Sequence, residues 1–274
     1  MSAACNLCGG TDARVLETAT DGVRTVRCSR CRLIFLDPFP QFDSAEHYNA
    51  DYYRPWLEGQ AHRRAGLWAE RADLLQKFAR VGHLLDVGCG DGSFLLAAQK
   101  RGWRVTGTEV SPWAAQRLRL THGLAILEGD LLQIDPLQIQ VDVVTMWHVL
   151  EHTDRPLQTL RRARELLAED GRLLVAVPNA GFTLFRVAYP IARLRQLRYY
   201  TPGERELHLY HFTPLTLRSM VEHAGFRVIL EGIDHSALRP VNVLLEKAAK
   251  LVHALTGANC SEALLVGAAK AGAP

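Results

Sequence analysis

Four cysteines near the amino terminus have the spacing of a metal site. Cys5 and Cys8 form one pair and Cys28 and Cys31 a second, and two residues separate the members of each pair. This spacing lets both thiolates of a pair face one ion, and two pairs supply the four sulfur ligands of a tetrahedral zinc site. The alternative, a redox dithiol, needs only one pair. Because protein would fill all four positions around the ion, we expect a structural zinc ion and not a catalytic one.

A glycine-rich turn lies further along the chain. Gly88, Gly90 and Gly92 follow the apolar run His83–Val87 and precede a helical pattern. Glycines permit a tight turn and let a ligand approach the backbone amides at the start of a helix. A dinucleotide-binding turn would have glycine or alanine where this chain has Ser93, so the pattern favours a different ligand.

Acidic residues surround this turn. Asp86 precedes it, Glu109 ends the next expected strand, and Asp130 follows the third one. Carboxylates at these places repel a pyrophosphate but suit an amine, a cation and the hydroxyl groups of a ribose. The alternative is that these acids only cap helices and form turns, as aspartate often does.

Short apolar runs alternate with helical patterns along most of the chain, which indicates a parallel sheet covered by helices on both faces. The expected strands are 83–87, 103–108, 125–128, 141–147, 172–177, 226–231 and 262–269. The expected helices begin near residue 61 and continue with 93–100, 112–121, 156–167, 214–223 and 241–255. An aromatic-dense linker at 41–60 precedes them and could contact the following domain.

The run Leu85-Asp86-Val87-Gly88-Cys89-Gly90-Asp91-Gly92 resembles motif I of the class I S-adenosylmethionine-dependent methyltransferases. The segment 141–152 resembles the fourth-strand motif of the subgroup that contains ubiquinone-biosynthesis-type enzymes. The cysteine ribbon together with this domain is similar to a bacterial subset that includes sugar C-methyltransferases and other natural-product enzymes. The resemblance implies S-adenosylmethionine as the cofactor, and it implies these binding residues: Asp86, Gly88, Cys89, Gly90, Gly92, Glu109, Asp130, Leu131 and Trp147.

The fold that follows is a doubly wound, Rossmann-like, mostly parallel sheet of seven strands, with an antiparallel last strand and a small zinc ribbon in front. We expect the ribbon at 1–40, the aromatic linker and a helix at 41–80, and the methyltransferase domain at 81–274.

Three histidines are candidate catalytic residues. His148 directly follows the fourth expected strand, where ligands bind in doubly wound sheets. The segment around His208 resembles one in sugar C-methyltransferases in which a histidine acts as the base, and His208 occupies that position. Leu207 stands where that family has a glutamate. His211 belongs to the same cluster. A histidine suits the removal of a proton as the methyl group transfers, but His208 and His211 could also serve only to bind the backbone.

The run from His148 through Glu151 to His152 also matches the signature of inverted zinc peptidases. That signature needs a helix, whereas the run follows a strand directly, so we expect a loop. Resemblance to ubiquinone-type enzymes leaves a divalent-metal role for Glu151 and His152 open.

A basic insertion is expected at 179–210. Its stretch 182–200 holds four arginines, several aromatic residues and no acid. We expect an amphipathic helical cover over the active site. The alternatives are a lid that grips an anionic acceptor, a peripheral contact with lipid, and a contact with single-stranded RNA.

Composition excludes several classes of protein. The 274 residues are 48% hydrophobic and 22% charged, which excludes global disorder. A net charge of +3 is too small to indicate a nucleic-acid partner by itself. No apolar run reaches the length of about 20 residues that a membrane span needs, and no signal-peptide pattern begins the chain. We therefore expect a cytoplasmic protein.

Together these features predict a methyltransferase that acts by in-line displacement on a small or carrier-linked metabolite, such as a sugar, a natural product, or a polysaccharide or lipid precursor. Two alternatives stay open. One is an RNA base methyltransferase that uses the ribbon as a clamp, and the other is a catalytically inactive binding module of the same fold.

Overall fold

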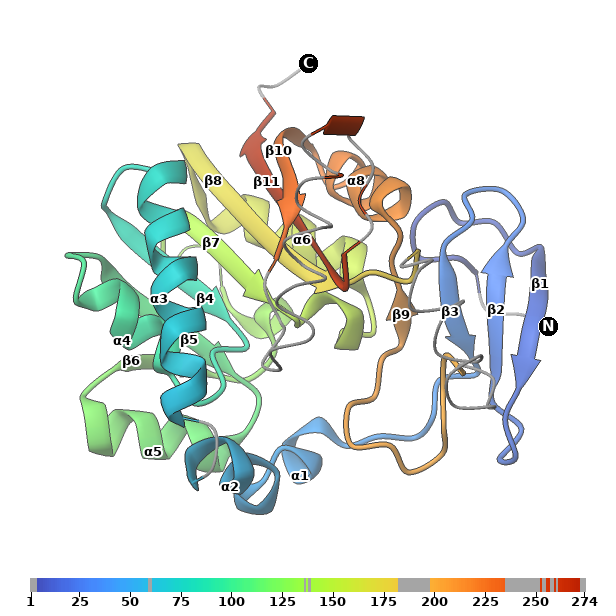
Figure 1. Ribbon diagram of the computed structural model, residues 1–274, viewed down its shortest axis with the longest axis horizontal. Coiled ribbons are helices and arrows are strands. Elements are labelled where there is room, and N and C mark those ends of the chain that lie inside the picture. Colours follow the sequence, from blue (N-terminus) through green and yellow to red (C-terminus); the bar gives the residue numbers. More distant parts are fainter. Residues whose placement is uncertain are drawn as a thin grey trace.

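The computed structural model describes residues 4–58, 61–135, 137, 139–181, 198–234, 252, 255–256, 259 and 261–271. These residues build two sheets, one of four strands and one of seven (Figure 1). The smaller sheet has the order β1-β2-β3-β9, with β1 at Ala13–Thr18, β2 at Arg24–Cys28, β3 at Ile34–Asp37 and β9 at Tyr210–His211.

The larger sheet has the order β10-β11-β8-β7-β4-β5-β6. Strand β11 runs antiparallel to both of its neighbours, and the remaining pairs are parallel. This confirms the expected seven-stranded, mostly parallel sheet with an antiparallel last strand. The strands are β4 (His83–Val87), β5 (Arg104–Glu109), β6 (Ala125–Glu128), β7 (Val141–Trp147), β8 (Leu167–Pro178), β10 (Phe226–Ile233) and β11 (Ala263–Lys270).

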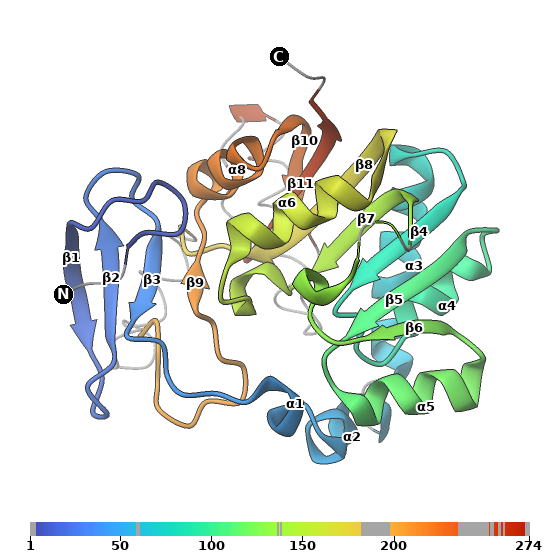
Figure 2. The same cartoon turned by 180° about the vertical axis from the view of Figure 1, so that it is seen from behind.

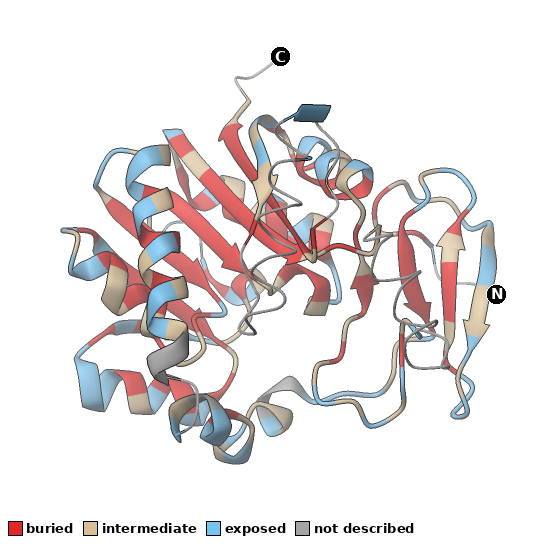
Figure 3. Ribbon diagram, in the orientation of Figure 1, coloured by how far each residue is buried: buried red, intermediate tan, exposed pale blue. Residues whose placement is uncertain are grey.

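Helices cover both faces of this sheet. Helices α3 (Ala61–Phe78), α4 (Ser93–Gln99) and α5 (Pro112–His122) pack on one face, and α6 (Pro156–Leu166) and α8 (Pro214–His223) pack on the other (Figures 1 and 2). In β4, Leu84 packs in the cluster with α3, α4 and α5, and Leu85 packs in the cluster with α6 and α8, because side chains alternate across a strand. Figure 3 shows the buried strands between helices whose outer surfaces are exposed.

The cysteine ribbon contains a strand that lies far away in the sequence. Strand β9 pairs with β3 through Ile34 with His211 and Phe35 with Tyr210. The expected helix 241–255 and most of the basic stretch 182–200 lie outside the described residues. None of the helices that the structure describes has both the length and the hydropathy that crossing a membrane requires.

Candidate functional site

The carboxyl ends of β4, β5 and β7 open into one cavity of about 810 Å³. This is the edge where parallel doubly wound sheets bind ligands. Most of the expected cofactor residues line the cavity, namely Gly88, Cys89, Gly90, Glu109, Asp130, Leu131 and Trp147. The candidate catalytic residues His148 and His208 line it as well.

The glycine turn has the backbone that its sequence predicts. Gly88, Gly90 and Gly92 have φ values of 64°, 56° and 75°, in the left-handed region that glycine adopts without strain. A Cβ atom at Gly88 would lie 2.8 Å from Val149, and one at Gly92 would lie 2.6 Å from Leu118. The turn therefore requires glycine both for its backbone and for its close packing.

Glu109 holds this turn in place. One carboxylate oxygen accepts the amide hydrogen of Gly90 at 2.9 Å, and the other accepts that of Ser111 at 2.9 Å. Burial raises the pKa of Glu109, while these backbone amides work in the opposite direction. Glu109 is only 3% exposed and lines the cavity, so its carboxylate links the glycine turn to the cavity wall.

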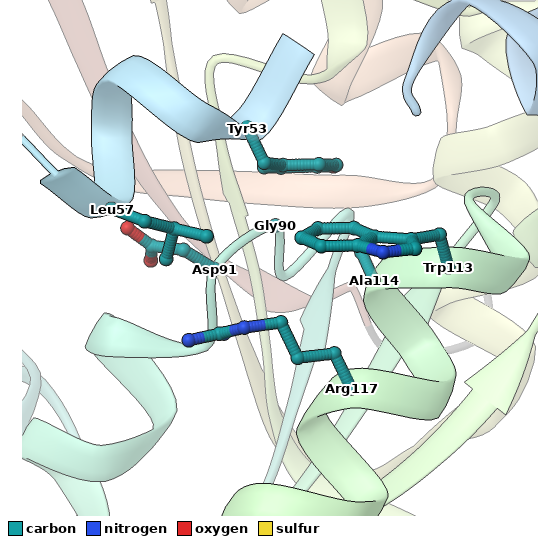
Figure 4. A pocket seen from close by; sticks show the side chains of 7 residues that line it. All are labelled: Tyr53, Leu57, Gly90, Asp91, Trp113, Ala114 and Arg117. Atoms are coloured by element: carbon teal, nitrogen blue, oxygen red, sulfur yellow. The ribbon is translucent and has the colours of Figure 1, made fainter. Parts of the chain in front are cut away.

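The aromatic linker lies against the glycine turn. It forms two short helices, α1 (Ser44–His47) and α2 (Ala50–Glu58). The ring of Tyr53 in α2 stacks on Trp113 with centroids 5.8 Å apart (Figure 4). Figure 4 also shows Gly90 beside this stacked pair.

The other expected cofactor residues have additional partners. Asp86 lies behind the cavity wall and accepts a hydrogen bond from the hydroxyl of Thr145 at 2.6 Å. Burial raises the pKa of Asp86 to about 7. Asp130 caps the short helix η1 (Leu131–Gln133) through the amide of Leu132, as the helix-cap alternative anticipated. The Cys89 side chain packs close to Gly107, so Cys89 faces the cavity through its backbone.

His148 belongs to a buried chain of alternating charges. Its Nε2 lies 2.9 Å from Asp234, which forms a 2.5 Å ion pair with Arg71. Its Nδ1 lies 3.6 Å from Glu151. Although burial opposes protonation, the hydrogen bond to Asp234 and the nearby carboxylate of Glu151 raise the pKa of His148 to about 9. Because both ring nitrogens face carboxylates, His148 is suited to donate hydrogen bonds and not to act as a base.

Two tryptophans hold Arg71 in this chain. The guanidinium carbon lies 4.7 Å from the ring centroid of Trp68 and 4.6 Å from that of Trp147. Cation–π contacts of this kind gain strength where water is excluded, and the side chain of Arg71 is 5% exposed. The arginine therefore fixes the wall on which Trp147 lies.

Glu151, His152 and His208 form a second cluster, which we call the histidine wall. The expected loop is present, because only the short 3₁₀ turn η2 (Leu150–His152) follows β7, and not the α-helix of a zinc peptidase. The ligand atoms of the three side chains all lie within 4.8 Å of one another. Such a group can share a proton or a cation.

Protonation differs within the histidine wall. A backbone carbonyl can only accept, so the 2.6 Å contact between Nδ1 of His152 and the oxygen of Leu207 places the proton on Nδ1. Burial and the neighbouring charge of His152 lower the pKa of His208 to about 4. His208 is therefore neutral near pH 7 and can accept a proton. Both Glu151 oxygens are buried without a hydrogen-bond partner among the residues described.

His211 lies beside the histidine wall, with its ring centroid 6.2 Å from that of His208. It is in β9, paired with Ile34, and its ring contacts Tyr199 with centroids 5.0 Å apart. It is not among the residues that line the cavity. This position favours a structural role in the ribbon sheet over the catalytic role that the sequence suggested.

The four ribbon cysteines converge as their spacing predicts. Their sulfur atoms lie within 4.8 Å of one another, with Cys5 to Cys31 and Cys8 to Cys28 at 3.5 Å. A tetrahedral zinc site with Zn–S bonds of about 2.3 Å has S–S edges of roughly 3.8 Å, so the donor set fits the ion. All four are free thiols and not disulfides.

The sequence did not reveal Arg71 or Asp234 as parts of the site. Both look like ordinary charged residues, one inside a long helix and one after a strand. A buried position on the apolar face of the helix was the available signal for Arg71, since Ala72 and Leu75 beside it are fully buried. No pattern in the sequence around Asp234 indicates that this residue belongs to the site.

Similarity to known proteins agrees with this geometry. The chain is 34% identical over 119 residues to a ubiquinone biosynthesis O-methyltransferase of Pseudomonas aeruginosa, which covers 40% of this chain and 48% of that protein. It is 25% identical over 165 residues to the Coxiella burnetii protein of the same name, covering 57% of this chain and 69% of the relative. The match thus spans about half the length of the first of these relatives.

Solved structures share the fold. A magnesium protoporphyrin IX methyltransferase from Synechocystis has a TM-score of 0.57 at 17% identity, covering 83% of this chain and 98% of that one. A Burkholderia thailandensis 1,6-didemethyltoxoflavin-N1-methyltransferase has a TM-score of 0.55 at 15% identity, covering 95% of this chain and 100% of that one. A family model described as a methyltransferase domain matches residues 60–231, which is more than half of the chain. The protein therefore belongs to this methyltransferase family.

Proposed function

We propose that the protein transfers a methyl group from S-adenosylmethionine to a small or carrier-linked metabolite. The observation that carries this proposal is a single cavity in which a glycine turn held by Glu109 faces the histidine wall. The acids around the turn suit a cationic, phosphate-free nucleoside. The relatives named above, which methylate small molecules by their names, support the same class of acceptor.

Several residues would hold the cofactor. Glu109 has lone pairs on the cavity side of the turn and would accept ribose hydroxyls, while Asp130 and Leu131 would border the adenine. Asp86 lies behind the turn and, in its ionised form, adds negative potential there. When bound, S-adenosylmethionine supplies an electrophilic methyl group on a sulfonium ion.

The chain's own groups would do the remaining work. His208, neutral at pH 7, accepts the proton that leaves the acceptor, and the imidazolium it forms would lie next to the Glu151 carboxylate. His148 directs its two ring nitrogens at Asp234 and Glu151 and thereby holds the cavity wall. Holding the acceptor in line with the methyl group lowers the barrier by several kcal/mol before any proton moves.

We further propose that the ribbon cysteines hold a structural zinc ion, that the protein is cytoplasmic, and that nucleic acid is not its partner. Four thiol ligands leave no open position for substrate. The net charge of +3 gives little attraction to phosphate backbones.

Calorimetry with S-adenosylmethionine and S-adenosylhomocysteine tests the cofactor assignment. We expect the wild-type protein to bind both ligands and Glu109→Gln to bind at least about tenfold more weakly, since a hydrogen bond to a charged group contributes about 1.5–3 kcal/mol. Glu128→Gln is the matched control, because this acid ends the neighbouring strand but pairs with Arg119 and does not line the cavity. Wild-type protein that binds neither ligand would refute the proposal.

A further inference from the structure

The segment 207–210 connects the ribbon to the catalytic cavity. His208 lies in the histidine wall, and Tyr210 two residues later begins β9, a strand of the ribbon sheet. The polypeptide chain therefore runs directly from the histidine wall into the ribbon sheet. A movement of the ribbon relative to the large sheet would be transmitted directly to His208.

Hydrogen bonds attach this segment on both sides. On the ribbon side, the amide of Leu36 donates to the carbonyl of Leu209 at 3.0 Å. On the cavity side, the amide of Leu209 donates to the carbonyl of Glu151 at 2.9 Å, and His152 donates to the carbonyl of Leu207 at 2.6 Å. Leu209 thus bridges β3 and the histidine wall through its two backbone groups.

A second connection starts inside the first cysteine pair. The side-chain oxygen of Asn6, which lies between Cys5 and Cys8, accepts the amide hydrogen of Leu157 at 3.1 Å. Leu157 is in the first turn of α6, the helix that follows the histidine wall. Arg155, at the N-cap position, makes no side-chain cap, so Asn6 supplies the acceptor that this helix start lacks.

The apolar core is continuous across the same boundary. Cys5, Leu7 and Cys28 of the ribbon belong to one hydrophobic cluster with Leu209 and with Leu160 of α6. Because interiors are close-packed, a shift of the cysteine pairs displaces these neighbours.

We propose that the four-cysteine ribbon is a positioning element for the histidine wall, with Asn6 as a positioning residue, and not a separate module for an external partner. The catalytic importance of this positioning rests on the proposed function. An ion held by the four thiols would fix both cysteine pairs, and through Asn6 and β3 it would fix the turn η2 and His208. Among the described residues, no hydrogen bond joins the ribbon to β4 or β5, the strands that build the cofactor side of the cavity.

The experiment compares Asn6→Ala with Asn6→Asp. Aspartate keeps an oxygen acceptor and suits a helix N-terminus, so it restores the contact that alanine removes. Arg14→Ala, on the exposed strand β1, is a control within the ribbon. For each variant we would measure hydrogen exchange at the Leu157 and Leu209 amides, the histidine ring nitrogen spectrum, metal content, and affinity for S-adenosylhomocysteine.

In Asn6→Ala we expect exchange at the Leu157 amide about tenfold faster, which corresponds to about 1.4 kcal/mol, the size of one lost hydrogen bond. We also expect shifted ring signals of His152 and His208, with metal content and cofactor affinity unchanged. Asn6→Asp and Arg14→Ala should resemble wild type. Unchanged exchange and histidine signals in Asn6→Ala would overturn the inference.

Removal of the metal is the second arm. After treatment with a chelator, the folded protein should show shifted signals of His152 and His208 while retaining affinity for S-adenosylhomocysteine. Unchanged histidine signals in metal-free, folded protein would also overturn the inference. If chelation unfolds the protein, the comparison of Asn6→Ala with Asn6→Asp tests the inference without the metal-removal experiment. Failure of the proposed function is distinct, because it appears as absent cofactor binding in wild type.

Discussion

Replacing Asp234 with asparagine tests the buried charge chain most directly. The substitution keeps the shape of the side chain but removes the charge that faces both Arg71 and His148. Asp234 is 4% exposed, so water cannot replace the lost charge. Burial opposes its ionisation, yet the charge of Arg71 and the hydrogen bond from His148 lower the pKa of Asp234 to about 2. Wild-type Asp234 is therefore ionised throughout the usual pH range.

Two contributions set the expected loss of stability. An arginine left buried without its partner costs about 3–5 kcal/mol in the free energy of unfolding. In addition, the pKa of His148 is raised from 6.5 to about 9, which corresponds to roughly 3 kcal/mol shared between Asp234 and Glu151. Below pH 6.5 this histidine contribution is fully present, and it is lost as the pH rises through 9.

Urea unfolding at pH 6 and at pH 10, with NMR titration of His148, is the assay. The stability gap between wild type and Asp234→Asn should be larger at pH 6 than at pH 10, and the pKa of His148 should fall in the variant. Asp73→Asn is the control, because Asp73 is about half exposed and its pair with Arg101 contributes little. A wild-type His148 that titrates near 6.5, or a gap independent of pH, would refute the reasoning.

Three further predictions concern the other parts of the site. Cys8→Ser should lower the bound zinc measured by elemental analysis, and a wild-type protein purified without metal would contradict the assignment. With an acceptor in hand, His208→Ala should slow turnover by about 10²–10⁴-fold, and unchanged turnover would remove His208 from the mechanism. Gly88→Ala should lower the melting temperature and weaken S-adenosylhomocysteine binding. The reason is that Gly88 has a φ of 64° and that a Cβ atom there would lie 2.8 Å from Val149. A variant with the wild-type melting temperature and affinity would contradict this prediction.

Local patterns in the sequence were sufficient for several features. The strands of the large sheet appear in the sequence as short apolar runs, and the helices that cover it appear as helical hydrophobic patterns. The alternation of these two patterns along the chain predicted the architecture. The glycine turn and the cysteine pairs are short-range patterns too, and their geometry agrees with the prediction. In each case the residues that define the feature are close neighbours in the chain, so their spacing alone restricts the backbone.

Only the tertiary structure decided which distant groups meet. Arg71 and Asp234 are 163 positions apart, and Asp234 and His148 are 86 apart, and no periodicity relates residues at such separations. The contact with Asp234 raises the pKa of His148, whereas burial lowers the pKa of His208. The sequence by itself determined the fold, the backbone of the glycine turn and the convergence of the four cysteines, because each follows from local spacing. The protonation of the histidines and the joining of the ribbon to the cavity depend on which charges and strands folding brings together.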